Sequence, residues 1–283
     1  SLLTQTGIYQ NEKMKILAAY LSETGTKIYI SQHGGHYGLG LYSFFEDHEY
    51  SISDYFLSWG WDLKTRDKVV PFGSLNLLNK RKFNKFSKRG NGILLVLMAL
   101  PRYSYNLYSA TISSSQVRNY HFDQFRFASS LEKKLLKILK VRFCSEDFGF
   151  NIKKEWEKRF PSIEFDDNKK NIFQLFKKYK VFICTYNATT LLEMLHVNVP
   201  TIIFFDKNNW EIRNSFKIYI NLLKENKILH ETPELAASFL KENYNLIDDW
   251  WYSDKVQSAR SIFCEKFAYV PNDPLKKISN ILL

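Results

Sequence analysis

The segment Ser31–Gly40 combines two histidines, His33 and His36, with four glycines among ten residues. Imidazole exchanges a proton near neutral pH, so either histidine could act as a general base or, when protonated, could hold a phosphate. Glycine lets the backbone adopt positive φ and approach a ligand closely, which makes Gly34 and Gly35 candidate ligand-binding residues. The alternative is an ordinary glycine-rich turn with two incidental histidines.

Two neighbouring carboxylates, Glu46 and Asp47, lie in the acidic and aromatic segment Tyr42–Tyr50. A carboxylate that faces a substrate can accept the proton of a hydroxyl group, so both are candidate catalytic residues. An exposed acidic turn would have the same composition.

The sequence shows no recognisable metal site. His33 and His36 have no third ligand at a spacing typical of zinc sites, and no Asp-x-Asp pair stands out. Three scattered cysteines, Cys144, Cys184 and Cys264, form no paired framework and favour a reducing compartment. We therefore expect neither a bound metal nor a cofactor.

A second candidate site lies between Cys184 and Glu193, where an apolar strand ends in small polar residues and a helix begins. Thr185, Asn187 or Thr189 could cap that helix, and its unpaired N–H groups, with Thr190, could bind a phosphate. Glu193, one turn inside the helix, could accept hydrogen bonds from a ribose. A plain capped helix uses the same residue types.

Arg102 and Tyr103 follow another apolar strand, Ile93–Leu100. At the carboxyl end of a strand, an arginine can bind a phosphate or diphosphate through two hydrogen bonds. A surface arginine after Pro101 is the simpler interpretation.

Strand and helix patterns alternate along the chain. The continuous apolar run Ile93–Leu100 is typical of a strand buried on both faces of a parallel sheet. Other strands are expected at Lys27–Ser31, Tyr55–Trp59, Val69–Ser74, Lys140–Cys144, Pro161–Phe165, Val181–Thr185 and Thr201–Phe205. Helices are expected at Gly7–Leu21, Ser115–Leu139, around Trp156, at Asn171–Tyr179, Thr189–His196, Pro233–Asn243 and Trp250–Phe267, with a further helix start at Ser51–Asp54. The alternation predicts an α/β fold with doubly wound parallel sheets, in which Ile93–Leu100, Val181–Cys184 and Thr201–Phe205 are interior strands.

The 283-residue chain carries a formal net charge of +11, which suits anionic partners. Basic residues concentrate in Lys80–Arg89, around Phe83 and Phe86. This change of composition predicts a basic linker at 79–92 between an N-terminal domain, 1–78, and a C-terminal domain, 93–283. The linker could be solvated, could contact an anionic membrane surface, or could bind nucleic acid, although no recognised nucleic-acid motif is present. No apolar run is long enough to span a bilayer.

Several of these motifs resemble those of known enzymes. The helix start with Glu193, followed by Asn198-Val199-Pro200 and an apolar strand, is similar to the donor-binding domain of GT-B glycosyltransferases. More narrowly, Gln32–Gly38, Glu46–Glu49 and Ser58–Trp61 resemble a family of transferases of bacterial O-antigen and other surface-polysaccharide gene clusters. The resemblance extends from about Tyr29 to Asp206. It departs from the family before the histidine-glycine segment, where we expect a reduced or truncated N-terminal domain and an acceptor site lying mainly in the part not seen.

This resemblance implies a metal-independent, cytoplasmic enzyme that transfers a sugar from a nucleotide-sugar donor to a glycan or lipid-linked glycan, at the inner face of the membrane. The nucleotide would lie on the helix start at Asn187–Thr190, opposite His33 and His36, with His33 the stronger catalytic candidate because it directly follows a strand. Other hypotheses are a non-hydrolysing nucleotide-sugar epimerase, a polyol-phosphate transferase, and a basic nucleic-acid-binding or scaffold protein. No specific binding of nucleic acid is expected.

Overall fold

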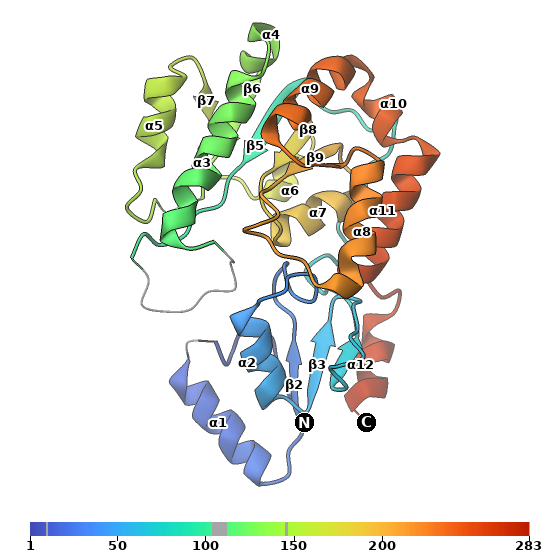
Figure 1. Cartoon of the computed structure of the whole chain (residues 1–283). Coiled ribbons are helices and arrows are strands. Elements are labelled where there is room, and N and C mark those ends of the chain that lie inside the picture. Colours follow the sequence, from blue (N-terminus) through green and yellow to red (C-terminus); the bar gives the residue numbers. More distant parts are fainter. Residues whose placement is uncertain (10, 104–111, 145–146, 283) are drawn as a thin grey trace.

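The computed structural model describes residues 1–9, 11–103, 112–144 and 147–282, which form two parallel sheets, one in each half of the molecule. Figure 1 shows the first sheet at the bottom and the second at the top, with the loops at the end of the first sheet facing the second domain. The α/β fold with doubly wound parallel sheets, predicted from the alternation of apolar runs, is confirmed.

The first sheet has the order β1-β2-β3-β4, and every neighbouring pair is parallel. Its strands are β1 (Leu2–Thr4), β2 (Ile28–Ser31), β3 (Tyr55–Ser58) and β4 (Val69–Pro71). Two helices connect them, α1 (Glu12–Glu23) and α2 (Phe44–Ile52). The predicted helix start at Ser51–Asp54 is wrong, because α2 ends there. Its first turn uses the acidic and aromatic segment, which the sequence did not assign to a helix.

The second sheet has the order β10-β9-β8-β5-β6-β7 and is parallel throughout. Its strands are β5 (Gly92–Val96), β6 (Leu139–Arg142), β7 (Glu164–Phe165), β8 (Tyr179–Cys184), β9 (Thr201–Phe204) and β10 (Leu229–His230). The three strands predicted to be interior, now β5, β8 and β9, each lie between two neighbours, which confirms that prediction. Their side chains are buried on both faces, as their unbroken apolar runs require.

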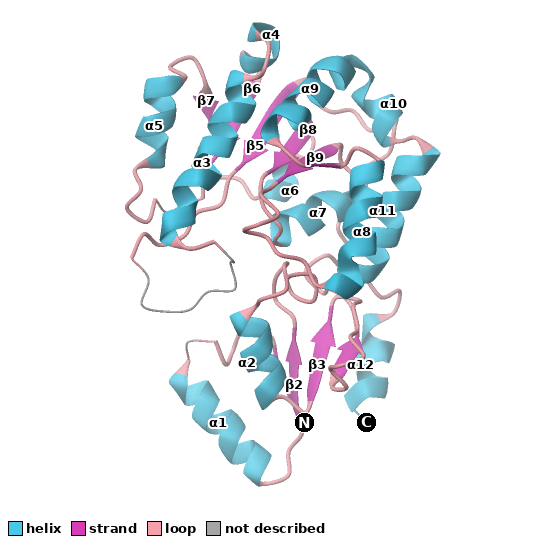
Figure 2. Cartoon of the chain, in the orientation of Figure 1, coloured by secondary structure: helices cyan, strands magenta, loops and turns pink. Residues whose placement is uncertain are grey.

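The remaining helices surround the second sheet, except α12 (Pro274–Leu282), which lies beside the first sheet (Figure 2). They are α3 (Ser114–Ser129), α4 (Lys133–Leu136), α5 (Ile152–Arg159), α6 (Ile172–Leu175), α7 (Thr189–Val197), α8 (Lys217–Glu225), α9 (Pro233–Asn243), α10 (Ile247–Trp251), α11 (Asp254–Phe267) and α12 (Pro274–Leu282), with short 3₁₀ turns at Asn214–Phe216 and Tyr244–Leu246. The long helix predicted over Ser115–Leu139 divides into α3 and α4, and Leu139 already belongs to β6. Similarly, Tyr179 starts β8 instead of ending a helix, and β10 was not predicted.

The chain returns to the first sheet at its end. Ile278 and Ile281 of α12 pack against a cluster of Tyr29, Leu57 and Phe72 (Figure 1). A segment that composition assigned to the C-terminal domain therefore covers one face of the first sheet.

The basic segment Lys80–Arg89 lies on the second domain and is partly built into it. Phe83 is buried, and its N–H donates to the carbonyl of Val197 over 2.7 Å. Arg89 pairs with Asp248. Phe86, in contrast, is 89% exposed. Some side chains of this segment therefore pack against the second domain, and others face solvent. We call Lys80–Arg89 the strap.

Candidate active site

Gln32, directly after β2, holds the start of the histidine-glycine loop through a buried network of hydrogen bonds. Its Oε1 accepts from the backbone N–H of Trp59 at 2.9 Å and from Nε1 of Trp61 at 2.8 Å. Its Nε2 donates to the carbonyl of Gly34 at 2.7 Å. Two tryptophans that follow β3 thus fix the path of the chain that leaves β2. The motifs Gln32–Gly38 and Ser58–Trp61 are therefore parts of one structural unit.

Two glycines of the loop make room for aromatic rings. Gly38 has φ of 71°, and a Cβ there would lie 2.3 Å from the indole of Trp61. A Cβ at Gly40 would lie 2.1 Å from the imidazole of His36. Neither position can carry a side chain without displacing a buried ring, so these glycines are explained by packing within the loop.

Gly35 brings the loop against the second domain. Its N–H donates to Oγ1 of Thr189, the first residue of α7, over 2.8 Å. A Cβ at Gly35 would lie 2.3 Å from the carbonyl carbon of Ala188. The loop thus faces the predicted helix start. The N-cap residue of α7 is Ala188, whose methyl group cannot accept a capping hydrogen bond, and not Thr185, Asn187 or Thr189 as the sequence suggested.

His33 lies beside a buried carboxylate that the sequence did not single out. Its Nδ1 is 3.2 Å from Oε1 of Glu49, and the hydroxyl of Tyr37 lies 3.2 Å from Nδ1. Glu49 is 4% exposed, whereas the His33 side chain keeps 21% of its surface in solvent. Burial and the neighbouring Glu49 raise the pKa of Tyr37, so its hydroxyl stays protonated. The arrangement gives His33 a carboxylate partner and a solvent-facing edge, which suits an imidazole that accepts a proton.

A helical pattern could have revealed Glu49. It lies three residues after Glu46, and residues at that spacing share one face of a helix. Because the sequence did not place a helix at Phe44–Ile52, this relation was not visible.

His36 occupies a different environment. It is buried, its Nε2 is 2.9 Å from the carbonyl oxygen of Tyr42, and its ring meets Trp210 edge to face. Burial lowers the pKa of His36 to about 4, so the imidazole is neutral at physiological pH. This placement favours a packing role for His36 over the catalytic role suggested by its sequence.

Glu46 is also buried, in an ion-pair cluster that joins the two domains. Its Oε1 is 2.8 Å from Arg213 of the second domain and 3.3 Å from Arg66, and its Oε2 accepts from the N–H of Gly38. Asp47 is exposed and pairs with Arg66. Burial raises the pKa of Glu46, but a carboxylate with no exposed surface cannot meet a substrate hydroxyl. The cluster therefore supports a structural role for Glu46, and Arg213 is an interdomain contact that sequence reasoning missed.

A pocket of about 510 Å³ opens at the carboxyl ends of the strands of the second sheet. Thr190 and Glu193 of α7 line it, together with Asn168, Asn171, Phe143 and Ile172. Burial raises the pKa of Glu193 to about 7, and Lys80 opposes this only in part. The pocket thus joins polar side chains that suit a hydroxyl-rich ligand to apolar walls.

The other candidate ligand-binding residues lie outside this pocket. Thr185 is fully buried and bridges the Val96 carbonyl and the Tyr120 hydroxyl, at 2.9 and 2.7 Å. Asn187 is 1% exposed, and neither polar atom of its side chain has a hydrogen-bond partner among the described residues. Arg102 and Tyr103 line a separate pocket, so the structure does not bring Arg102 together with Glu193 as the sequence suggested.

Within the described ranges, no three His, Cys, Asp or Glu side chains come together in a way that could hold a metal ion. None of the helices in the same ranges combines the length and apolar character needed to cross a membrane.

A protein-family model described as LIC12162 family transferase matches residues 1–282. The chain belongs to this family.

The chain is also similar to several solved structures. S. aureus TarM, in a complex with fondaparinux, alpha-GlcNAc-glycerol and UDP, matches 93% of this chain and 53% of its own, with 12% identity and a TM-score of 0.52. MurG of Acinetobacter baumannii matches 87% of this chain and 68% of its own, with 10% identity and a TM-score of 0.44. UDP-GlcNAc 2-epimerase of Neisseria meningitidis matches 89% of this chain and 78% of its own, with 12% identity and a TM-score of 0.46.

The match to TarM supports a GT-B-like fold for this LIC12162 family transferase, as the resemblance implied. The chain spans about half the length of the TarM structures that it matches. A comparison with curated protein sequences gives no match.

Adding one methyl group at Gly35 of the transferase should separate the loop from α7. Gly35→Ala would place Cβ against backbone atoms that cannot rotate away, and overpacking of this kind costs about 1–3 kcal/mol. Chemical denaturation should show that loss. Gly34→Ala is the matched control, because its Cβ would meet only the side-chain oxygen of Thr189 at 3.2 Å. Equal stability of the two variants would contradict the proposed contact.

Glu193→Gln should stabilise the transferase at alkaline pH. The folded-state pKa of about 7 exceeds the ordinary value of 4.5, so the neutral carboxyl contributes stability below about pH 4.5 that is lost as the pH rises through 7. Glutamine is neutral at every pH, and we expect a gain of about 1–3 kcal/mol at pH 8 and a much smaller change at pH 5. Unfolding curves at both pH values measure this, with Glu225→Gln on the exposed side of α8 as the control. A gain that does not depend on pH would exclude the ionisation of Glu193 as its cause.

Proposed function

We propose that this family member is a glycosyltransferase that moves a sugar from a nucleotide-sugar donor to a bacterial surface polysaccharide of the lipopolysaccharide or capsule type. The observation that carries this proposal is the pocket beside Thr190 and Glu193, which opens at the carboxyl ends of parallel strands. The same helix, α7, contacts the loop of His33 through its first residue, Thr189. Open α/β sheets bind ligands at such positions. TarM, whose fold this chain shares, is named in complex with UDP, which supports a nucleotide as part of the donor.

The nucleoside would occupy the pocket of about 510 Å³, a volume within the range of small-molecule sites. Phe143 and Ile172 offer apolar contact to a base, and Asn168 and Asn171 offer hydrogen bonds to its edge. Glu193 would accept hydrogen bonds from the ribose hydroxyls. An ionised carboxylate accepts these bonds best, so the ligand would restore the charge that burial disfavours.

The diphosphate would extend from this pocket towards the start of α7. The positive end of the helix dipole suits a negative group there, and so does the side-chain amide of Asn187, whose polar atoms have no hydrogen-bond partner among the described residues. Gly35 already lies against Thr189, so the phosphates would bind beside Gly34 and Gly35 and not between the loop and the helix. Backbone amides and the helix dipole would stabilise the departing diphosphate without a metal ion or a cofactor.

His33 would act as the general base. As the acceptor oxygen attacks the anomeric carbon, its proton would pass to the imidazole, while the bond from that carbon to the donor phosphate breaks and leaves its electrons on the nucleoside diphosphate. Glu49, 3.2 Å from Nδ1, would orient the ring and stabilise the imidazolium. The protonated hydroxyl of Tyr37 would fix the carboxylate in turn.

The acceptor would reach the site from an anionic membrane surface. The strap Lys80–Arg89 presents Phe86 together with exposed Arg81, Lys82 and Lys88, a combination of basic and aromatic side chains that suits an anionic interface. A lipid-linked glycan is the acceptor class that such a contact serves best. The protein would then work on the inner face of the membrane, in the cytoplasm.

Substitution of His33 should abolish turnover without abolishing donor binding. His33→Ala should lower kcat by about 10²–10⁴, the usual contribution of a general base, with little change in donor affinity. Glu49→Gln should lower kcat by a smaller factor, because the imidazole of His33 keeps a neutral hydrogen-bonding neighbour in place of the carboxylate. Radiolabelled sugar transfer into membrane lipid extracts measures kcat.

His48→Ala is the matched control, because His48 lies on the exposed side of the same helix as Glu49. Comparable turnover in His33→Ala and His48→Ala would remove His33 from the mechanism. Product analysis without acceptor separates transfer from the alternative chemistry: a new sugar epimer in the absence of acceptor would indicate an epimerase, and phosphate travelling with the transferred group would indicate a polyol-phosphate transferase.

Nucleotide binding should depend on the ionisation of Glu193. We expect nucleoside diphosphates to raise the melting temperature, because a ligand of the folded state stabilises it. Nucleotide binding should tighten as the pH rises through 7, because Glu193 then ionises. Glu193→Gln should weaken nucleotide binding roughly tenfold at pH 8. The variant should keep only the pH dependence that comes from the ionisation of the nucleotide itself. Calorimetric titrations between pH 6 and 8.5, with Glu225→Gln as the control, test this. Tight nucleotide binding by Glu193→Gln at pH 8 would show that the pocket is not used as proposed.

A further inference from the structure

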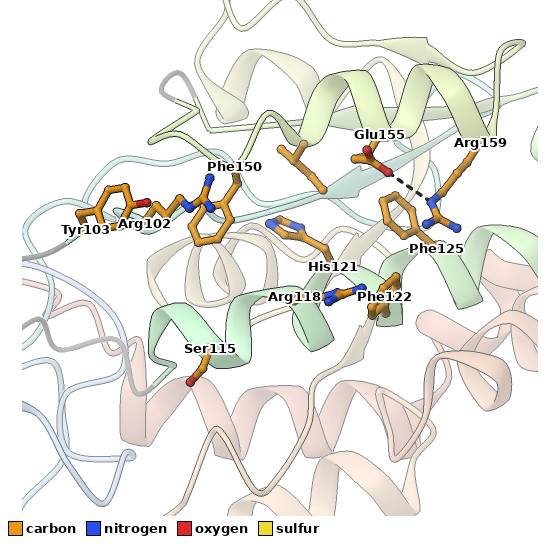
Figure 3. A pocket seen from close by; sticks show the side chains of 11 residues that line it. Arg102, Tyr103, Ser115, Arg118, His121, Phe122, Phe125, Phe150, Glu155 and Arg159 are labelled. Atoms are coloured by element: carbon orange, nitrogen blue, oxygen red, sulfur yellow. Dashed lines mark ion pairs between the residues drawn. The ribbon is translucent and has the colours of Figure 1, made fainter.

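A second pocket, of about 660 Å³, lies between α3 and α5 on the second domain. Figure 3 shows its side chains converging from both helices and from the segments around Arg102 and Phe150. None of the residues that line it lines the proposed nucleotide pocket, so it is a separate site. Its volume is that of a site for a small organic molecule.

The charges in this pocket are mainly positive. Three of its lining residues are arginines and one, Glu155, is a carboxylate. Glu155 is 3.8 Å from Arg159, a long ion pair (Figure 3). Arg118 lies over the ring of Phe122 at 5.3 Å, and in the described part of the chain no carboxylate pairs with it. The guanidinium of Arg118 is therefore available to an anion.

His121 adds a buried polar atom without a partner. The residue is 6% exposed, and its Nδ1 has no hydrogen-bond partner among the described residues. Its ring meets Phe150 edge to face at 6.3 Å and lines the pocket (Figure 3). Burial lowers the pKa of His121 to about 4, against the opposing influence of Asp147, so the neutral imidazole offers one N–H or one lone pair. Leaving such a group unpaired destabilises a protein, which points to a ligand that satisfies it.

The walls of the pocket define the rest of the ligand. Phe122, Phe125, Phe150 and Ile152 are apolar. Besides the charged side chains and His121, the polar groups that line it among the described residues are the hydroxyls of Ser115 and Tyr103. The apolar side chains offer no hydrogen-bond partner to the hydroxyl groups of a sugar or nucleoside, and they suit an apolar body instead. The nucleotide pocket differs in just this respect, since Asn168, Asn171 and Thr190 line it.

We propose that this second pocket binds a phosphate ester with an apolar body, with Arg118 and His121 holding the phosphate and the phenylalanines enclosing the apolar part. Such a ligand could be the phosphate end of a prenyl-type lipid or a free apolar phosphate. The site goes beyond the transfer reaction proposed above and does not depend on it. A smaller pocket of about 260 Å³ shares Ile152 with this site and Phe143 with the nucleotide pocket, so the two sites are neighbours along one edge of the sheet.

Binding of geranyl phosphate to the full chain tests the proposal. We expect saturable binding with one molecule per chain, and weaker or no binding of geraniol and of inorganic phosphate, each of which has only half of the recognised chemistry. Arg118→Gln should weaken geranyl phosphate binding at least tenfold, whereas Lys154→Gln, an equal loss of charge on the exposed face of α5, should change it less than twofold. Equal affinity for inorganic phosphate, or equal loss in both variants, would overturn the proposal.

His121→Phe separates binding from folding. The substitution keeps a ring of similar size and removes the unpaired nitrogen, so the melting temperature should stay the same or rise while geranyl phosphate binding weakens. A lower melting temperature with unchanged binding would make His121 a structural residue and the proposal wrong.

Two further experiments identify the source of the phosphate ester and test whether it binds independently of the nucleotide donor. Flotation with neutral vesicles that contain a long-chain prenyl phosphate should recover the wild-type chain but not Arg118→Gln if the ligand is a lipid; binding confined to soluble geranyl phosphate would assign the site to a free apolar phosphate. Saturating nucleoside diphosphate, or Glu193→Gln, should leave geranyl phosphate binding intact. Competition between the two ligands would show a single shared site and would overturn the proposal while leaving the nucleotide pocket in place.

Discussion

The backbone of Gly35 lies against the first residue of α7 with no room for a side chain between them. That approach brings the end of β2, from the first sheet, to the carboxyl ends of the second sheet. Only glycine can occupy the position, and its N–H bonds the side chain of Thr189. The location of His33 relative to the proposed nucleotide pocket, and with it the proposed chemistry, depends on this contact between domains.

Two buried polar networks hold the contact in place. Gln32 ties the loop to Trp59 and Trp61 within the first domain. Across the interface, Glu46 binds Arg213, which also donates to the carbonyl of Gly38 over 2.7 Å. Removal of one partner from a buried ion pair leaves an uncompensated buried charge and is strongly destabilising, so each member of such a network depends on the others. Residues that look catalytic in the sequence, Glu46 and His36, are used to position the loop.

Several of the buried groups that are poorly satisfied lie in the second domain. The carboxyl of Glu193 is held at a raised pKa, and His121 and Asn187 have polar atoms without partners among the described residues. Each lowers the stability of the protein, and a polar ligand that reached the group would relieve that cost.

The sequence by itself determined the alternation of strands and helices, the three interior strands of the second sheet, and the two segments that carry the site. Those features depend on local apolar patterns and on residues close together in the chain, which is why the histidine-glycine loop and the start of α7 could be recognised. Only the tertiary structure decided which side chains share an environment. Glu49 reaches His33 because α2 folds back over β2, Arg102 lies apart from Glu193 because the chain after β5 turns towards α5, and His36 is buried because the second domain covers it. Burial and long-range pairing arise from contacts between distant residues, so spacing along the chain could not distinguish the exposed histidine from the enclosed one.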